Sequence, residues 1–353
     1  MIKKTIKILI SFLLITLISI VLLDILPISR TYDKDNAFIR KNERPLIIPH
    51  GGAKALYPEN TLHAFKNTDQ YDMFEIDLTL TKDLVLIAHH DLDLRHDLNR
   101  SLFQPDLLIK NLTYQEIVSI IKDNDYPYVR SFVNIDGQKP YENEMDQSIL
   151  DELIPVKLET IFSLYPNKYY ILEIKDLQGE TTQFEKAVEA LMTLITNYDM
   201  KDNVIVSSFD DKVIKAFKRL SNNEITTSTA SKETMNFVLF SAFSLDFFYK
   251  PTDALLIIPF EDQVSDSQVS LLKKLPGFIR RKIVRYDEVE ERYLTNIAQK
   301  SLIEDAREKN LAVIFWTVNE KEDMRYLVEL GVDGIITDRP DLLEEVLNEY
   351  EFN

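Results

Sequence analysis

The residues of this chain best suited to proton transfer are histidines at the ends of apolar runs. The chain has five His, of which His50 ends LIIPH, and His89 and His90 end VLIAHH. An imidazole can take up and release a proton near neutral pH, as general acid–base catalysis requires. Because neighbouring strand residues face opposite ways, we expect only one of His89 and His90 to face a pocket.

Carboxylates form a second group of candidate residues. Glu75 and Asp77 are two positions apart in MFEIDLTL, and Glu173 and Lys175 repeat this spacing in YILEIK. Strand residues two apart share a face, so each pair would point the same way. Inward carboxylates are costly unless a cation offsets them, and Mg²⁺ and Ca²⁺ both take carboxylate oxygens. The pattern therefore favours a divalent metal site, with a plain ion-pair cluster as the alternative.

The composition excludes several classes of protein. The 353 residues include 41 Lys+Arg and 58 Asp+Glu, for a net charge of −17, and 45% are hydrophobic. That hydrophobic content is too high for a disordered chain. Cys is absent, which excludes disulfides, thiol nucleophiles and zinc–thiolate sites. The acidic balance argues against a nucleic-acid partner, which would need a basic face.

The pattern of apolar runs predicts how these residues are positioned. From Pro45 onward, nine strand candidates alternate with helical patterns, which is typical of βαβ units and a parallel sheet. We predict an α/β fold, a TIM-type (β/α)8 barrel, whose active site lies at the carboxyl ends of the strands. Only about six residues separate Leu78 from Leu84, too few for a parallel crossover. One piece around Thr79–His89 should therefore be a hairpin-like excursion.

The first residues are expected to anchor the chain in a membrane. Lys3, Lys4 and Lys7 precede an apolar stretch, and residues 8–27 would span roughly 30 Å as a helix, the thickness of a bilayer core. The lysines favour a cytoplasmic N-terminus, and DILPISR offers no small-residue cleavage site. We therefore predict a single-pass transmembrane signal anchor and an extracytoplasmic catalytic domain. A cleaved signal peptide and a buried core helix are the alternatives.

The remaining domain boundaries follow from composition. Residues 1–7 would be cytoplasmic, 8–27 the anchor and 28–44 a polar linker, and 45–349 would form the barrel. Two stretches fit the strand–helix repeat poorly and are expected to be enlarged loops, near 101–151 and 231–292.

The candidate residues also belong to a longer ordered series of motifs. The chain carries, in order, H-G-G, P-E-N-T, E-I-D, T-K-D, H-D, I-P, E-I-K, S-F, W-T-V-N and G-V-D-G-I-I-T-D-R-P. This series resembles the glycerophosphodiester phosphodiesterase family, over about Leu46 to Leu347. No single tripeptide is diagnostic, but the ten motifs in this order and spacing are specific.

The resemblance implies a β/α barrel that hydrolyses glycerophosphodiesters to glycerol 3-phosphate and an alcohol with the help of a divalent cation. It places the general acid and base on His50 and His90. The same resemblance puts the metal carboxylates on Glu75, Asp77 and Glu173. Lys175 would neutralise phosphate charge.

Further residues are expected around this site. Trp316, the only Trp, is a candidate wall for the alcohol of the substrate, and Glu59 and Asn60 are candidate supports. One departure concerns phosphate binding. The family usually has H-R-G, whose Arg contacts the phosphate, whereas this chain has Gly51. A lost guanidinium weakens phosphate recognition unless Lys54, Arg95 or the backbone N–H groups of Gly51-Gly52 replace it.

Two other functions remain open at this point. One is a phospholipase D-like action on membrane lysophospholipids, and the other is a membrane-tethered binding domain that has lost catalysis. The sequence leaves open the substrate alcohol, Mg²⁺ against Ca²⁺, and the order in which the two histidines act. It also leaves open whether water or the glycerol 2-hydroxyl attacks first, and the oligomeric state.

Overall fold

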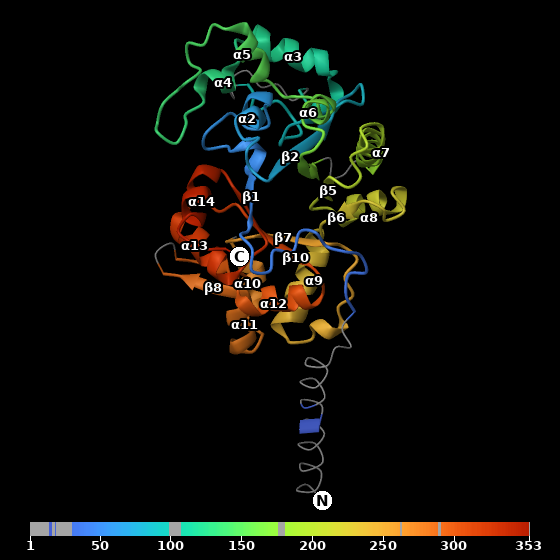
Figure 1. Cartoon of the computed structure of the whole chain (residues 1–353), viewed down its shortest axis with the longest axis vertical. Coiled ribbons are helices and arrows are strands. Elements are labelled where there is room, and N and C mark those ends of the chain that lie inside the picture. Colours follow the sequence, from blue (N-terminus) through green and yellow to red (C-terminus); the bar gives the residue numbers. More distant parts are fainter. Residues whose placement is uncertain are drawn as a thin grey trace, which may run out of the picture.

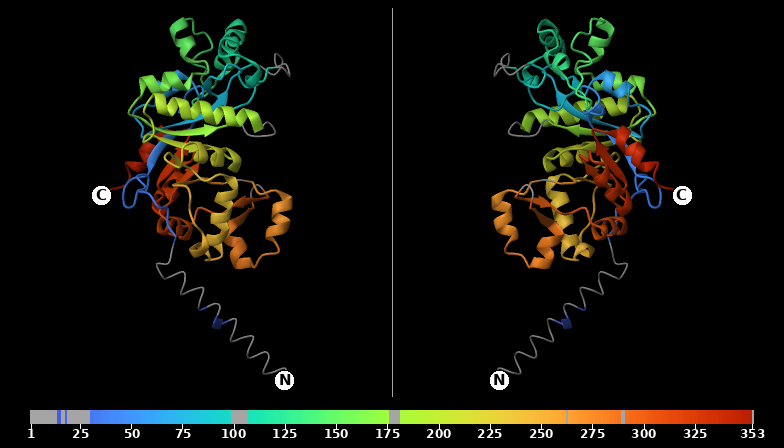
Figure 2. Two further views of the ribbon diagram at one scale, coloured as in Figure 1. Left: turned by 90° about the vertical axis from the view of Figure 1, so that its right-hand side faces the viewer. Right: turned by 90° about the vertical axis from the view of Figure 1, so that its left-hand side faces the viewer.

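The strand–helix alternation folds as the predicted TIM-barrel-like α/β architecture. The computed structural model describes residues 14, 15, 18, 30–98, 107–175, 181–261, 263–288 and 291–352. Within these residues, eight strands each precede a helix that packs outside them (Figures 1 and 2). The strands are β1 (Leu46–Pro49), β2 (Met73–Leu80), β4 (Tyr169–Ile174), β5 (Val204–Ser207), β6 (Thr226–Thr227), β7 (Leu255–Pro259), β10 (Ala312–Trp316) and β11 (Gly334–Thr337).

The strands follow one another around the barrel in chain order. One sheet has the order β1-β11-β10-β7 and the other β3-β2-β4-β5-β6. A parallel bridge between Ser228 and Leu255 joins the two sheets on one side. On the other side β1 contacts β2, and the Asp72 carboxylate accepts the Ile47 N–H at 2.8 Å. The carboxyl ends of the barrel strands therefore meet at one end, where the sequence predicts the site.

One predicted strand lies outside the barrel. β3 (Leu86–Ala88) pairs antiparallel with β2, with Ala88 opposite Leu78. Leu84 has a φ of 62°, and the Thr81 N–H donates to the Val85 carbonyl at 3.0 Å, which closes the tight connection. The hairpin-like excursion predicted for this stretch is confirmed.

The helices shield the outer faces of the strands. Phe74 and Leu172 lie in one buried cluster between strands and helices, and Phe315 and Ile335 lie in another. Side chains such as Ile48 and Ile314 fill the barrel interior. The eight barrel helices are α2 (Leu62–Lys66), α6 (Leu158–Leu164), α7 (Thr181–Asn197), α8 (Asp211–Leu220), α9 (Ser231–Ala242), α12 (Lys300–Glu308), α13 (Lys321–Leu330) and α14 (Pro340–Leu347).

Two groups of further elements lie in the stretches predicted as enlarged loops. The first forms a helical layer with a core of its own, which includes Ile117, Val129 and Leu153, at the top of Figure 1. Its elements are η2 (Ile109–Asn111), α3 (Tyr114–Asp123), α4 (Pro127–Ser131) and α5 (Gln147–Glu152). The second follows β7 and contains α10 (Asp266–Leu272), α11 (Gly277–Ile283) and the hairpin of β8 (Val284–Asp287) and β9 (Arg292–Thr295). Two short 3₁₀ turns, η1 (His50–Gly52) and η3 (Asp246–Phe248), complete the described elements.

The N-terminal predictions meet the structure only in part. The predicted membrane anchor, residues 8–27, lies outside the described residues except for positions 14, 15 and 18. Among the described residues, no helix combines the length and apolar character needed to cross a bilayer. The described part of the predicted linker packs on the barrel, where the N–H of buried Tyr32 donates to the Lys309 carbonyl at 2.9 Å.

Candidate active site

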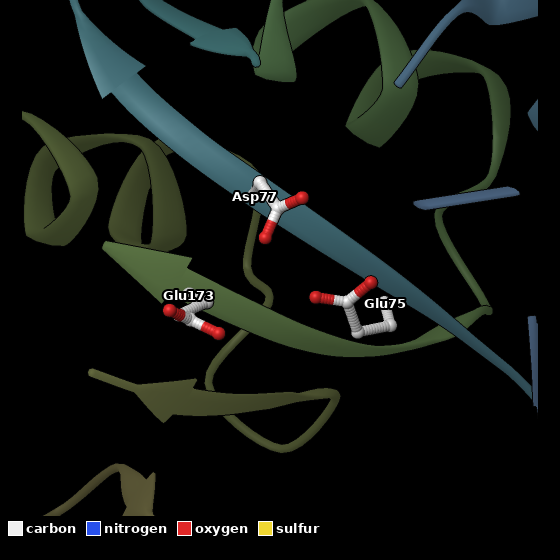
Figure 3. A group of neighbouring side chains, drawn as sticks. All are labelled: Glu75, Asp77 and Glu173. Atoms are coloured by element: carbon white, nitrogen blue, oxygen red, sulfur yellow. The ribbon is translucent and has the colours of Figure 1, made fainter. Parts of the chain in front are cut away.

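Three carboxylates meet on the two neighbouring strands that the sequence indicated. Glu75 and Asp77 extend from β2, and Glu173 extends from β4, directly opposite Asp77 in the strand register (Figure 3). One oxygen from each lies within 4.8 Å of the other two. Glu75 and Asp77 are buried. So much negative charge away from water requires a cationic partner.

Two lysines supply positive charge beside these carboxylates. Lys175 Nζ lies 3.1 Å from Asp77 Oδ1 and 2.7 Å from Glu173 Oε1. Lys54 Nζ lies 2.5 Å from Glu59 Oε2 and 3.8 Å from Asp77 Oδ2. Burial alone would lower the pKa of both ammonium groups, but the neighbouring carboxylates raise both pKa values above the ordinary range. Both lysines are therefore held in the charged form.

The three carboxylates differ in how easily they hold a proton. Burial raises the pKa of Glu75 above its ordinary value, and the charge of Asp77 adds to this effect. Burial likewise raises the pKa of Glu173. Burial acts on Asp77 in the same direction, but the charges of Lys175 and Lys54 outweigh it and lower the pKa of Asp77. The cluster thus has a firmly ionised centre and two flanking carboxylates that would gain from more positive charge.

The chemistry of this cluster fits a hard divalent cation. Its candidate ligands are all carboxylate oxygens, the type that Mg²⁺ and Ca²⁺ prefer. Asp77 Oδ1 and Glu173 Oε1 are buried and accept no well-formed hydrogen bond from the described residues, although Lys175 Nζ is within ion-pair distance of both. Such oxygens retain lone pairs for a metal ion.

His50 is fixed by a carboxylate from the last barrel strand. It follows β1, and Asp338 follows the adjacent β11, which pairs with β1 up to Pro49 and Thr337. His50 Nδ1 lies 2.8 Å from Asp338 Oδ1. Asn319 Nδ2 donates to the other Asp338 oxygen at 2.8 Å. Burial disfavours the imidazolium, yet Asp338 and the charge of Glu75 raise the pKa of His50 above its ordinary value.

His89 and His90 follow the end of β3 and differ in burial, although both line one pocket. His89 is buried, with Nε2 2.7 Å from Asp97 Oδ2 and Nδ1 2.7 Å from the Asp91 carbonyl. Although burial opposes it, Asp97 raises the pKa of His89 to about 9. The His90 side chain is 48% exposed, with Nδ1 2.8 Å from Asp91 Oδ1. It lines a pocket together with Asn60, the residue whose amide donates to Asp77 of the carboxylate cluster.

A small hollow adjoins His90 between the barrel and the helical layer. Glu59, Asn60 and Tyr128 line it together with His89 and His90. Glu59 also forms an ion pair with Lys54. Asn60 donates from Nδ2 to Asp77 Oδ2 at 3.0 Å, so both predicted support residues contact charged groups of the site.

The structure separates the three candidate replacements for the missing arginine. Gly51 has a φ of 53°, and a Cβ there would lie 2.9 Å from Lys54 Cε, so Lys54 passes over the glycine. The Gly51 N–H donates to Glu75 Oε2 at 2.7 Å and is already used. Arg95 lies at the periphery, and its side chain is 59% exposed. Its Nη2 lies 3.1 Å from Asp93 Oδ2. Of the candidate replacements for the missing arginine, Lys54 is thus the one that the fold brings into the cluster.

An aromatic pair borders the lysine side of the site. The Trp316 and Phe209 rings meet edge to face, with centroids 5.5 Å apart. Lys175 Nζ lies 5.6 Å from the centroid of the Phe209 ring. Phe209 is 42% exposed. The sequence indicated Trp316 but neither Phe209 nor the contact of Asp338 with His50. The S-F and T-D-R-P motifs, at the ends of β5 and β11, are the signals that point to them.

Comparisons with known proteins agree on one family. A model of the glycerophosphoryl diester phosphodiesterase family matches residues 50–342. A glycerophosphodiester phosphodiesterase of Caldanaerobacter subterraneus subsp. tengcongensis is 25% identical over 306 residues, 85% of this chain and 96% of the relative. Human lysophospholipase D GDPD3 is 24% identical over 313 residues, 85% of this chain and 84% of the relative.

One solved structure adds a product complex. It is an Oleispira antarctica phosphodiesterase in complex with the product sn-glycerol-3-phosphate. The likeness has a TM-score of 0.55 at 18% identity and covers 86% of this chain and 97% of that one. At this identity the likeness establishes a shared fold.

Proposed function

Because this chain belongs to the glycerophosphoryl diester phosphodiesterase family, and is therefore a phosphoric diester hydrolase, we propose that it hydrolyses glycerophosphodiesters to glycerol 3-phosphate and an alcohol. The observation that carries this proposal is the meeting of Glu75, Asp77 and Glu173 beside Lys175. A phosphodiester is an anion, and the chain as a whole carries a net charge of −17. Binding it therefore requires concentrated local positive charge.

His50 and His90 would perform the proton transfers. Asp338 accepts the Nδ1–H of His50, which leaves Nε2 as the atom that can take up or give a proton to substrate. One histidine removes the proton of the attacking hydroxyl as its oxygen bonds to phosphorus. The other protonates the alcohol oxygen as its bond to phosphorus breaks. Water and the glycerol 2-hydroxyl are both admissible nucleophiles. Attack by the 2-hydroxyl gives a cyclic phosphate that a water molecule then opens.

Glu75, Asp77 and Glu173 would hold a divalent cation, Mg²⁺ or Ca²⁺, whose contribution is to offset the negative charge of the phosphate. Asp77 is the best fixed of the three, because Asn60 donates to one of its oxygens and Lys175 lies beside the other. Glu75 is oriented by the Gly51 N–H. The chain thus holds these oxygens in place before any ligand arrives.

Lys175 and Lys54 would bind the phosphate from two sides. Their ammonium groups lie 3.1 and 3.8 Å from opposite oxygens of Asp77. A lysine is a point charge without the planar fork of arginine. We therefore expect Lys54 to supply the charge, but not the two-pronged hydrogen bonding, that the family's arginine provides at the position of Gly51.

A panel of diesters tests this function directly. The full chain would be assayed on glycerophosphocholine, glycerophosphoethanolamine and glycerophosphoglycerol with Mg²⁺, with Ca²⁺ and with EDTA. We expect chelator-sensitive release of glycerol 3-phosphate, and loss of release in folded His50→Ala and His90→Ala variants. Normal turnover by either variant would remove that histidine from the mechanism. Failure to cleave any diester would favour a tethered binding domain instead.

Lysophospholipids are the second candidate substrates. Two observations favour them: the relative named lysophospholipase D, and the Trp316–Phe209 pair beside Lys175, which could border an apolar group. Assaying glycerophosphocholine against lysophosphatidylcholine separates the two substrate classes. A preference for the lysolipid that Trp316→Ala removes would establish the phospholipase D-like alternative.

We further propose that the chain is tethered to a membrane by residues 8–27, with the barrel on the extracytoplasmic side. The support is the sequence: Lys3, Lys4 and Lys7 precede an apolar run of bilayer length. Resistance to carbonate extraction, and digestion of the barrel by protease added outside intact cells, would be the expected results. Release of the chain by carbonate would contradict the tether.

A further inference from the structure

The segment after β7 has a charge unlike that of the rest of the chain. Residues 267–286 contain no Asp or Glu, although the chain has 58 of them in 353 residues. The same twenty residues contain six basic side chains, Lys273, Lys274, Arg280, Arg281, Lys282 and Arg285. This segment forms α10, α11 and most of β8. A strongly acidic domain thus carries one concentrated basic surface.

Among the described residues, few of these basic side chains have a charged partner, although Lys273 Nζ lies 5.4 Å from the centroid of the Tyr293 ring. Arg285 pairs with Glu261 and Asp287. The other five form no ion pair with a carboxylate among the described residues. Lys273, Lys274 and Arg281 are exposed. Cations that share one surface repel one another, so an anionic partner there would be attracted to them.

The same surface exposes large apolar side chains. Ile279 and Ile283 of α11 are buried in a cluster with Ala242 of α9. Phe278 points out and is 65% exposed, as is Leu271 at the end of α10. Figure 2 shows these two orange helices protruding from the barrel. Exposed aromatic and aliphatic tips beside basic side chains are typical of segments that lie in the interface of a membrane.

We propose that the α10–α11 face, formed by Leu271, Lys273, Lys274, Phe278 and Arg281, docks on a membrane surface that carries anionic lipid headgroups. The basic side chains contact the headgroups, while Phe278 and Leu271 enter the boundary between headgroups and acyl chains. This contact is separate from the N-terminal segment and from catalysis. It gives the barrel a second point of contact with the bilayer and so restricts how the barrel is oriented toward it.

The absence of Cys allows a position-specific test. Leu271→Cys, labelled with a polarity-sensitive dye, reports whether this face enters lipid. Met145→Cys, at an 83% exposed position in the helical layer at the other end of Figure 1, is the matched control. Each labelled full chain is mixed with vesicles of phosphatidylcholine alone or of phosphatidylcholine with phosphatidylglycerol. Dye emission, rather than co-sedimentation, is the readout, because the N-terminal segment could cause sedimentation by itself.

We expect a blue shift only for the Leu271 label, only with phosphatidylglycerol present, and weaker in high salt. Lys273→Gln, Lys274→Gln and Arg281→Gln together should shift the docking equilibrium on the order of 100-fold, about fivefold per charge. The matched control neutralises three exposed basic residues of α8, Lys212, Lys215 and Arg219, and should leave the shift intact. Both triple variants should cleave a soluble diester at the normal rate.

Three outcomes would overturn the proposal. They are the absence of a blue shift with either vesicle, an equal shift with both vesicles, and a shift caused by soluble polyaspartate but not by vesicles. The last result would identify an acidic protein as the partner of this face.

Discussion

His50 Nδ1 and Asp338 Oδ1 lie 2.8 Å apart, although 288 residues separate them in the chain. The contact exists because β1 and β11 are neighbours in the barrel. The carboxylate accepts the Nδ1–H, so it selects one tautomer and favours the protonated ring. Asp338 is therefore a positioning residue, which acts on substrate only through His50.

Asp338→Asn should slow turnover and change its pH dependence. Asp338 raises the pKa of His50, so the ring stays protonated to a higher pH in the native protein. Removing that charge lowers the pKa, and the limb of the kcat/KM profile that reports His50 should move to lower pH. The rate should fall by about 10²- to 10⁴-fold. Asp341→Asn, which breaks an ion pair with Arg339 rather than one with His50, should leave the profile in place. An unshifted limb in Asp338→Asn would assign the titration to another group.

Chelation should abolish activity, and Mg²⁺ or Ca²⁺ should restore it. A cation that binds only the folded chain also stabilises it, by about 2.7 kcal/mol at a concentration of 100 times Kd. Thermal unfolding with and without metal measures this effect independently of turnover. Glu173→Gln should lose both responses, whereas Glu189→Gln, on the exposed surface of α7, should keep them. Equal stabilisation of both variants by metal would place the cation elsewhere.

Lys54→Met should raise KM for the diester by roughly 10- to 100-fold, because it removes a hydrogen bond to a charged group. Lys82→Met, at an exposed position, is the control. Gly51→Arg alone should not improve binding, because its Cβ, 2.9 Å from Lys54 Cε, would displace the Lys54 side chain, and a side chain at a φ of 53° is strained. Combining Gly51→Arg with Lys54→Ala removes that contact and should recover part of the affinity. A normal KM in Lys54→Met would exclude Lys54 from phosphate binding.

Gly52→Ala should destabilise the fold more than Gly137→Ala. Both residues have a positive φ, 84° and 74°. A Cβ at Gly52 would lie 2.6 Å from the Ala64 Cβ of α2, whereas one at Gly137 would meet nothing within 4 Å. Backbone strain alone costs about 1–2 kcal/mol, and crowding adds about 1–3 kcal/mol at Gly52. Urea unfolding measures the difference, and equal costs would mean that α2 shifts freely.

The sequence was informative where chemistry and local pattern coincide. Two-residue spacing predicted that Glu75 and Asp77 share a face, and the short link after Leu78 predicted the antiparallel β3. The helix α3 also had a readable start, because Thr113 and Glu116 form a capping box. The polar composition of residues 101–151 nevertheless led us to predict an enlarged loop there, so this helix was not predicted.

The rest of the site depends on relations that one sequence does not display. Lys54 reaches the cluster through a turn that contains Gly51 and Ala53 at positive φ, so no strand or helix period predicts its direction. Phe209 meets Trp316 only because β5 and β10 end at the same rim of the barrel. Such contacts are set by strand register and barrel closure, which emerge only in the folded chain.

The pairing of the first barrel strand with the last also determines when the protein can become active during its synthesis. At about 5–20 residues per second, a ribosome needs roughly 15–60 seconds to pass from the first residue of β1 to its partner Gly334. Throughout that interval one edge of β1 has no strand to pair with. A nascent chain released before β11 would keep the open edge and lack Asp338 altogether. Completion of the chain, barrel closure and assembly of the catalytic pair are thus a single late event in biosynthesis.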